Sequence, residues 1–116
     1  MKRQRAEQRG RTGETIAAWW LRLHGWRILA MRVKTFAGEV DLVAQRGKTI
    51  AFVEVKTRAT EAELDIAIDR RRLQRIAAAA NLLAARYARR GEDIRIDVIL
   101  LCPWRRPRHI ANAWHG

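Results

Sequence analysis

The stretch GEVDLVAQRGKTIAFVEVKTR, residues 38–58, decides the fold of this chain. It contains two runs of apolar and β-branched residues, which are typical of buried strands. The segment Arg46-Gly47-Lys48 between the runs has the length and the glycine of a short hairpin connection. We therefore expect one strand over residues 39–45, a second over residues 49–57, and antiparallel pairing between them.

Charged side chains interrupt these apolar runs. Successive side chains of a strand point to opposite faces, so Glu54 and Lys56 share one face of the second strand. A hairpin that turns near Gly47 pairs residue 41 with residue 54, which brings Asp41 beside Glu54. The sequence therefore predicts that two carboxylates and one lysine meet on the sheet, with Glu39 flanking them.

The two acids need compensation, because an unpaired carboxylate in a buried strand is costly. One solution is a Mg²⁺ or Mn²⁺ ion held by Asp41 and Glu54, with the backbone carbonyl of Val55 and an accessory Glu14 as further ligands. Such an ion would polarise a phosphoryl oxygen, and Lys56 would orient or deprotonate the attacking water. The other solution is a structural ion-pair cluster with Lys56. The strand pattern leaves both solutions open.

Apolar residues at helical spacing predict two helices around the strands. The first covers residues 12–24, with Thr12 as its N-cap, and the second covers residues 63–89. Residues 1–11 are rich in basic residues and poor in apolar ones, so we expect a flexible basic arm there. The remaining residues, 12–116, have the length of a single domain.

Further strands extend the central pair. We expect strands over residues 26–34 and 94–101, and either a short edge strand or an irregular segment over residues 109–114. The resulting order, α-β-β-β-α-β, predicts an α/β fold with a mixed four- to five-stranded sheet flanked by helices. The last long strand follows a helical crossover, so it can add to the sheet in parallel.

The chain is strongly basic. It has 24 Lys and Arg residues against 12 Asp and Glu, which gives a net charge of +12 at pH 7. This surplus favours a nucleic-acid partner, because Lys and Arg neutralise phosphates and release counterions. The residues expected to contact the nucleic acid lie after the third strand, on the long helix and in a loop near the C-terminus: Arg58, Arg71, Arg72, Arg75, Trp104, Arg105 and Arg106.

Cysteine content and hydropathy disfavour several other classes of protein. Cys102 is the single cysteine, so the chain cannot form an internal disulfide or a zinc cluster of thiolates. That cysteine usage fits the reducing cytoplasm, where we expect the protein to reside. No apolar run approaches the length of a membrane span, so no membrane partner is expected.

The two motifs Gly38-Glu39-Val40-Asp41-Leu42-Val43-Ala44 and Phe52-Val53-Glu54-Val55-Lys56-Thr57-Arg58 resemble the YraN family, also called UPF0102. The resemblance extends from about residue 12 to residue 98, and includes Gly13-Glu14 and Arg95-Ile96-Asp97-Val98. The family's pattern is similar to that of the PD-(D/E)xK nuclease superfamily, which includes restriction endonucleases and archaeal Holliday-junction resolvases.

This resemblance implies a restriction-endonuclease-like fold and a role for each acid. Asp41 and Glu54 would be the metal-binding acids, Lys56 the catalytic lysine and Glu14 an accessory acid. One departure concerns the first strand, where the family often carries an asparagine near the position of Arg32.

The leading functional hypothesis is a Mg²⁺- or Mn²⁺-dependent endonuclease that hydrolyses phosphodiester bonds of DNA, including branched DNA, in preference to RNA. Cleavage of both strands would favour a homodimer. A second hypothesis is a non-catalytic nucleic-acid-binding module that retains the nuclease fold. A third is a protein-interaction domain whose acids form only an ion-pair cluster. Metal-dependent cleavage separates the first from the second, and salt-sensitive binding to DNA counts against the third.

Overall fold

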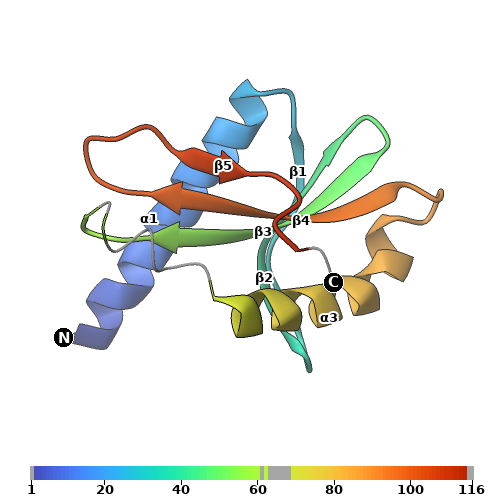
Figure 1. Ribbon diagram of the computed structural model, residues 1–116, viewed down its shortest axis with the longest axis horizontal. Coiled ribbons are helices and arrows are strands. Elements are labelled where there is room, and N and C mark those ends of the chain that lie inside the picture. Colours follow the sequence, from blue (N-terminus) through green and yellow to red (C-terminus); the bar gives the residue numbers. More distant parts are fainter. Residues whose placement is uncertain (1, 61, 63–68, 115–116) are drawn as a thin grey trace.

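A computed structural model describes residues 2–60, 62 and 69–114 of the chain (Figure 1). Its elements follow the predicted order, with one short strand added at the end. In chain order they are α1 (Lys2–Leu23), β1 (Arg27–Thr35), β2 (Gly38–Arg46), β3 (Thr49–Thr57), α3 (Arg70–Tyr87), β4 (Asp93–Leu101) and β5 (Arg108–Ile110).

The five strands form one mixed sheet in the order β1-β2-β3-β4-β5. The β2–β3 hairpin pairs Leu42 with Val53 and Val43 with Phe52, which confirms the predicted register. Strand β4 lies parallel to β3, because the chain crosses over through α3 between the two strands. The other neighbouring pairs are antiparallel. The predicted α/β architecture is therefore confirmed.

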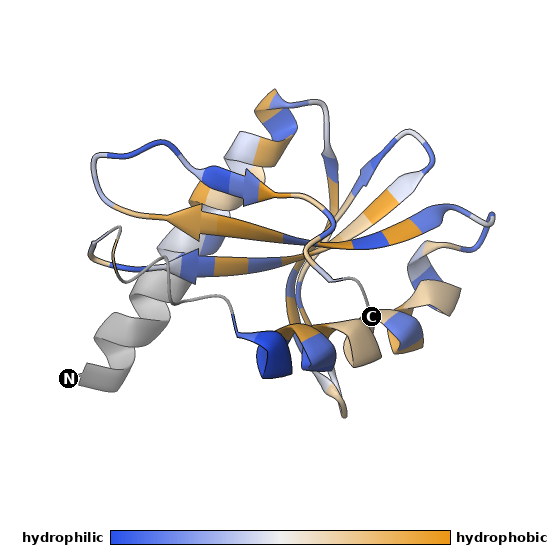
Figure 2. Cartoon of the chain, viewed as in Figure 1, coloured by the Kyte–Doolittle hydropathy of each residue, from blue (hydrophilic) through white to orange (hydrophobic). Residues whose placement is uncertain are grey.

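Each face of the sheet is covered by one described helix. Ala17 and Leu21 of α1 pack with Leu42 and Val53 on one face. The apolar stripe of α3 packs with Val43, Phe52 and their neighbours on the other face. The apolar positions concentrate in the middle of the sheet, whereas the connections at its ends are more polar (Figure 2). In the described part of the chain, no helix has both the length and the apolar character that a membrane span requires.

Helix α1 begins earlier than the sequence predicted. The predicted helix start and N-cap at Thr12 are wrong, because residues 2–11 continue α1. The flexibility expected of the basic arm stays a prediction. Lys, Arg, Gln, Glu and Ala dominate this segment and are good helix formers. The prediction was based on the spacing of apolar residues, which are scarce in this segment. Intrinsic helix propensity does not depend on that spacing.

Helix α3 is shorter than the predicted helix over residues 63–89. Asp69 has extended backbone angles, φ −117° and ψ 125°, and its side chain accepts a hydrogen bond from the Arg71 N–H. Asp69 is therefore the N-cap of a helix that begins at Arg70, because aspartate satisfies a free N–H in the first turn. Residues 63–68 lie outside the described residues. The helix ends at Tyr87, and the backbone N–H of Ala88 still bonds to the Ala84 carbonyl.

Strand β5 is held in place by a buried carboxylate. Asp97 of β4 is fully buried and accepts hydrogen bonds from Arg95, His109 and the backbone N–H of Asn112. Burial alone would raise the pKa of Asp97, but the bonds from His109, Asn112 and Arg95 outweigh it and lower that pKa. The bonds from Arg95 also make an ion pair with Asp97, with 3.0 Å between Arg95 Nε and Asp97 Oδ1. Its partners fix the segment after β5, so the edge strand ends at Ile110 rather than at residue 114.

Candidate active site

The candidate site lies where β2 and β3 stop pairing. The last paired residues on this side are Leu42 and Val53. Beyond them, a carboxylate oxygen of Asp41 accepts a hydrogen bond from the backbone N–H of Val55, at 2.8 Å. The side chain of Asp41 thus replaces a strand-to-strand bond and is fixed between the two strands. Its position beside β3 agrees with the predicted proximity of Asp41 and Glu54, and the Glu54 charge acts on Asp41.

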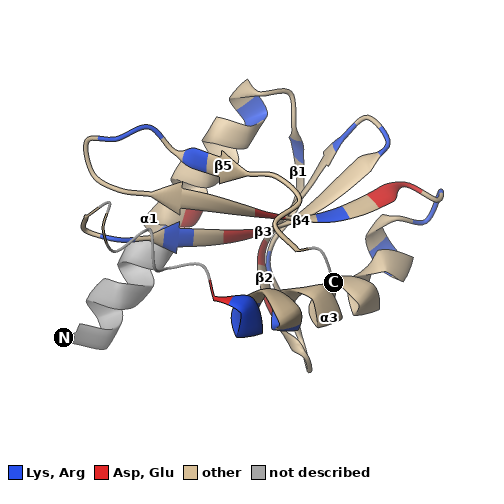
Figure 3. Ribbon diagram, in the orientation of Figure 1, with Lys and Arg blue, Asp and Glu red and all other residues tan. Residues whose placement is uncertain are grey.

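Three carboxylates converge at this point. Glu14 of α1 and Glu39 and Asp41 of β2 each offer an oxygen, and these oxygens lie within 4.8 Å of one another. Figure 3 shows acidic positions on α1, β2 and β3 amid many basic ones. Mg²⁺ binds oxygen ligands at about 2.0–2.1 Å, so oxygens on opposite sides of one ion are about 4 Å apart. The cluster therefore offers the donor type of a hard divalent cation, at a spacing close to that of ligands around one ion.

Burial and negative neighbours make Asp41 hard to ionise. Burial contributes most, the charges of Glu54 and Glu14 add to it, and the Val55 N–H and Arg72 oppose it. Together they raise the pKa of Asp41 to about 7. Without a cation, Asp41 is therefore partly protonated near neutral pH, and a bound cation would favour its ionised form.

On the α3 side of the sheet, Glu54 forms ion pairs with two basic side chains. Its buried carboxylate lies 3.1 Å from Lys56 Nζ and 2.6 Å from Arg72 Nε. Burial lowers the pKa of Lys56, although the nearby Glu54 charge opposes this shift. The structure thus contains an ion-pair cluster around Glu54 beside an acidic cluster around Asp41 that could hold a metal ion.

A glycine allows α1 to approach the end of β3. A Cβ atom added at Gly13 would lie 2.5 Å from Thr57 Oγ1, 3.5 Å from Leu101 Cδ1 and 3.7 Å from Val55 Cγ1. Any side chain at this position would therefore displace either the Thr57 side chain or the helix. Because Glu14 is the next residue of α1, the close approach at Gly13 places the Glu14 carboxylate beside Asp41.

We expect Gly13→Ala to lower the melting temperature of the wild type but to raise that of a Thr57→Ala background. In the wild type the new methyl group meets Thr57 Oγ1, and overpacking of this kind costs about 1–3 kcal/mol. When Thr57 Oγ1 is absent, only ordinary contacts remain, and alanine gains about 1 kcal/mol over glycine in helix propensity. Thermal melts of the four proteins in this cycle measure the coupling. Equal effects of Gly13→Ala in both backgrounds would contradict the contact.

Comparison with known proteins assigns the chain to a family. The model of the uncharacterised protein family UPF0102 matches residues 13–101, a range that includes the acidic cluster and the Glu54–Lys56 pair. The chain belongs to UPF0102. A UPF0102 protein of Rhizorhabdus wittichii is 64% identical over 99% of this chain and 98% of its own length. A UPF0102 protein of Erythrobacter litoralis is 68% identical over 98% of both chains.

A solved structure shares the fold. The Holliday junction resolvase Hjc of Archaeoglobus fulgidus matches 84% of this chain and 72% of its own, with a TM-score of 0.60 and 18% identity. The predicted restriction-endonuclease-like fold is thereby confirmed for this UPF0102 chain. At this identity the match establishes the fold alone.

Two residues of the UPF0102 site escaped the sequence-based reasoning. Glu39 was expected only to flank the site, yet its carboxylate belongs to the acidic cluster. Arg32 of β1 donates a hydrogen bond to Glu14, and no local pattern links positions 18 residues apart. The backbone of Arg32 is left-handed, with φ 55°. Asparagine tolerates that conformation better than arginine does, which agrees with the asparagine that the resemblance implied near this position.

The basic residues expected to contact nucleic acid divide into three groups. Arg71 and Arg75 are exposed on α3 and line a hollow of about 430 Å³ together with Ala37. Arg72 is bound to Glu54, and Arg58 donates a hydrogen bond to the Thr57 carbonyl. The third group, the exposed residues of the β4–β5 loop, comprises Trp104, Arg105 and Arg106.

Proposed function

We propose that this chain is a divalent-metal-dependent endonuclease that binds DNA, including branched DNA, and hydrolyses its phosphodiester bonds. The observation that carries the proposal is the acidic cluster of Glu14, Glu39 and Asp41 beside the buried Glu54–Lys56 pair. A fold shared with a Holliday junction resolvase and a net charge of +12 support the same substrate class.

The metal ion would be held by Asp41 together with oxygens from its neighbours. Glu14 and Glu39 complete a set within 4.8 Å, whereas Glu54 and the backbone carbonyl of Val55 would add ligands from β3. Mg²⁺ or Mn²⁺ bound there would supply Lewis-acid chemistry, polarising a phosphoryl oxygen and acidifying water. Two or more carboxylates with free oxygens are a donor set that both ions accept.

Lys56 would act on the attacking water and on the charge that develops at phosphorus. Hydrolysis forms one bond from the water oxygen to phosphorus, breaks the bond to the leaving sugar oxygen and delivers a proton to that oxygen. The lowered pKa of Lys56 makes its amine a better proton acceptor near neutral pH than an exposed lysine would be. The Glu54 carboxylate bonds to both Lys56 and Arg72, and these contacts hold the Lys56 side chain in place.

DNA binding would rest on phosphate contacts, so we expect affinity to fall steeply with salt. Arg71 and Arg75 are suited to such contacts, because both are exposed on the α3 surface, where a phosphate can reach their guanidinium groups. Replacing both by alanine should make the plot of log affinity against log salt shallower, by about 0.9 for each phosphate that is no longer neutralised. Arg89→Ala, an exposed change beyond the end of α3, is the matched control. A slope that is unchanged in the double variant would place the phosphate contacts elsewhere.

A cleavage screen tests the proposed activity directly. The wild type and Asp41→Asn are incubated with labelled duplex, single-stranded and four-way-junction DNA, each with Mg²⁺, with Mn²⁺ or with a chelator. We expect cleavage by the wild type only where a divalent ion is present, and none by Asp41→Asn. Salt-sensitive binding without cleavage of any substrate would instead support the non-catalytic nucleic-acid-binding module.

A further inference from the structure

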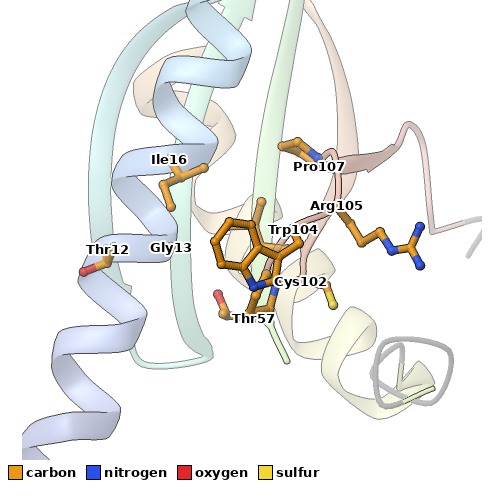
Figure 4. A pocket seen from close by; sticks show the side chains of 10 residues that line it. Thr12, Gly13, Ile16, Thr57, Cys102, Trp104, Arg105 and Pro107 are labelled. Carbon is orange, nitrogen blue, oxygen red and sulfur yellow. The ribbon is translucent and has the colours of Figure 1, made fainter. Parts of the chain in front are cut away.

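A pocket of about 550 Å³ lies beside α1, where Thr12, Gly13 and Ile16 line it (Figure 4). Helix α1 forms one wall, the ends of β3 and β4 form its floor, and the loop after β4 forms the opposite wall. Its lining is mostly apolar, and includes Ile16, Thr57, Leu101, Cys102, Trp104 and Pro107. Among the described residues that line it there is no acid, and Arg105 is the charged one.

Trp104 is held at the mouth of this pocket by an unfavourable turn. The backbone N–H of Arg105 bonds to the Cys102 carbonyl, so residues 102–105 form a turn with Pro103 and Trp104 in its centre. Trp104 has φ 65° at the position where such turns usually carry glycine or asparagine. The residue is also fully exposed, at 101% of the reference area. A large aromatic ring that is both solvent-exposed and in a strained conformation indicates a binding role rather than a packing role.

On both α1 and β3, a residue that lines the pocket is the sequence neighbour of a residue of the proposed site. Gly13 lines the pocket and precedes Glu14, while Thr57 lines it and follows Lys56. Successive residues of a strand point to opposite faces, so Thr57 opens onto the α1 face and Lys56 onto the α3 face. A polynucleotide whose phosphate lies at the acidic cluster can therefore reach the pocket with an adjoining base.

We propose that this pocket receives an unstacked nucleobase, with the Trp104 indole as its stacking platform. The inference rests on the proposed function, and it specifies the substrate class as nucleic acid with unpaired nucleotides beside the phosphate that is cut. An indole and apolar walls suit the flat face of any base, and Arg105 suits its phosphate. A base inside a continuous duplex cannot enter, because its faces are covered by its neighbours.

Binding experiments in a chelating buffer test the pocket without any need for cleavage. Wild type, Trp104→Ala and Trp104→Phe are titrated with a single-stranded oligonucleotide and with the matching duplex. We expect Trp104→Ala to weaken single-strand binding about 5- to 150-fold, because stacking on an aromatic side chain contributes that much per base. Trp104→Phe should retain most of the affinity. Duplex binding should change little, since it depends on phosphate contacts spread over the surface.

Trp19→Ala is the matched control, because Trp19 is another exposed tryptophan, lies on α1 and does not line the pocket. It should leave both affinities unchanged. Equal losses for single strand and duplex on Trp104→Ala would overturn the proposal, and so would no loss for either. These outcomes are independent of the cleavage screen, so a failure of the pocket and a failure of the proposed activity can be told apart.

The single cysteine provides a direct readout of occupancy. Cys102 lines the pocket and is half-buried, so its alkylation by iodoacetamide reports access to the pocket. We expect the single-stranded oligonucleotide at saturation to slow alkylation of Cys102 in the wild type, and the duplex at saturation to leave it nearly unchanged. Equal alkylation rates with and without the single strand would exclude a base from this pocket.

Discussion

Lys56→Met is expected to slow cleavage of DNA about 10²–10⁴-fold, the usual effect of losing a positioned proton-transfer or charge-stabilising group. DNA affinity should stay near that of the wild type, because binding is distributed over many arginines and Lys56 is buried. Single-turnover cleavage and a binding titration on the same substrate measure the two quantities. Lys48→Met, a change of an exposed lysine in the β2–β3 turn, controls for the loss of one positive charge.

The same variant separates catalysis from scaffolding. Removing one partner of a buried ion pair usually costs about 3–5 kcal/mol, because the other charge is left uncompensated. In this protein Arg72 also bonds to Glu54, at 2.6 Å, and we expect that bond to remain in Lys56→Met, so the loss of stability should be smaller. Combining Lys56→Met with Arg72→Ala strips Glu54 of both cations and should cause the full loss. A single Lys56→Met variant that melts as low as the double variant would mean that Lys56 serves the fold.

The central hairpin was predictable because its signals are local. Alternating apolar residues fix the faces of β3, and the glycine turn at Arg46-Gly47-Lys48 fixes which residues of β2 oppose it. The predicted bounds of β3, residues 49–57, are those of the structure. From that register alone, Asp41 falls beside Glu54 and Lys56. The helix boundaries were less predictable, since the first turns of α1 and the cap at Asp69 leave no mark in an apolar pattern.

Partners that come from distant elements were not predictable. Arg72 of α3 bonds to Glu54, and Arg32 of β1 bonds to Glu14, across 18 positions in each case. Both contacts depend on how a helix is rotated on the sheet, which strand periodicity does not specify. The placement of Glu39 in the acidic cluster likewise depends on the approach of α1, which Gly13 permits. The sequence thus located the acidic residues, but it did not indicate which arginine pairs with which acid.

Asp41→Asn is expected to abolish Mn²⁺ and Mg²⁺ binding and, without metal, to raise the melting temperature at neutral and alkaline pH. Asparagine can still accept the Val55 N–H bond, but it brings no negative charge to the cluster. The asparagine variant therefore loses the Asp41 metal ligand. It also loses the repulsion between Asp41 and the neighbouring carboxylates. Titration calorimetry measures the first effect, and thermal melts with a chelator measure the second. Asp93→Asn, a change of an exposed aspartate at the start of β4, is the matched control.

The sign of the pH dependence follows from the raised pKa of Asp41. Folding raises that pKa from 3.8 to about 7, so the folded protein binds the proton more tightly than the unfolded chain does. The contribution of Asp41 to the stability of the metal-free protein should therefore be fully present at low pH, decline as pH rises through this interval and level off above it. Asp41→Asn lacks this decline, so its advantage over the wild type should grow with pH and level off above about pH 7. The affinity of the wild type for metal should rise over the same interval, because the ion displaces the Asp41 proton. An advantage that shrinks as pH rises would show that Asp41 is ionised and compensated in the metal-free protein, and that its neighbours stabilise the charge.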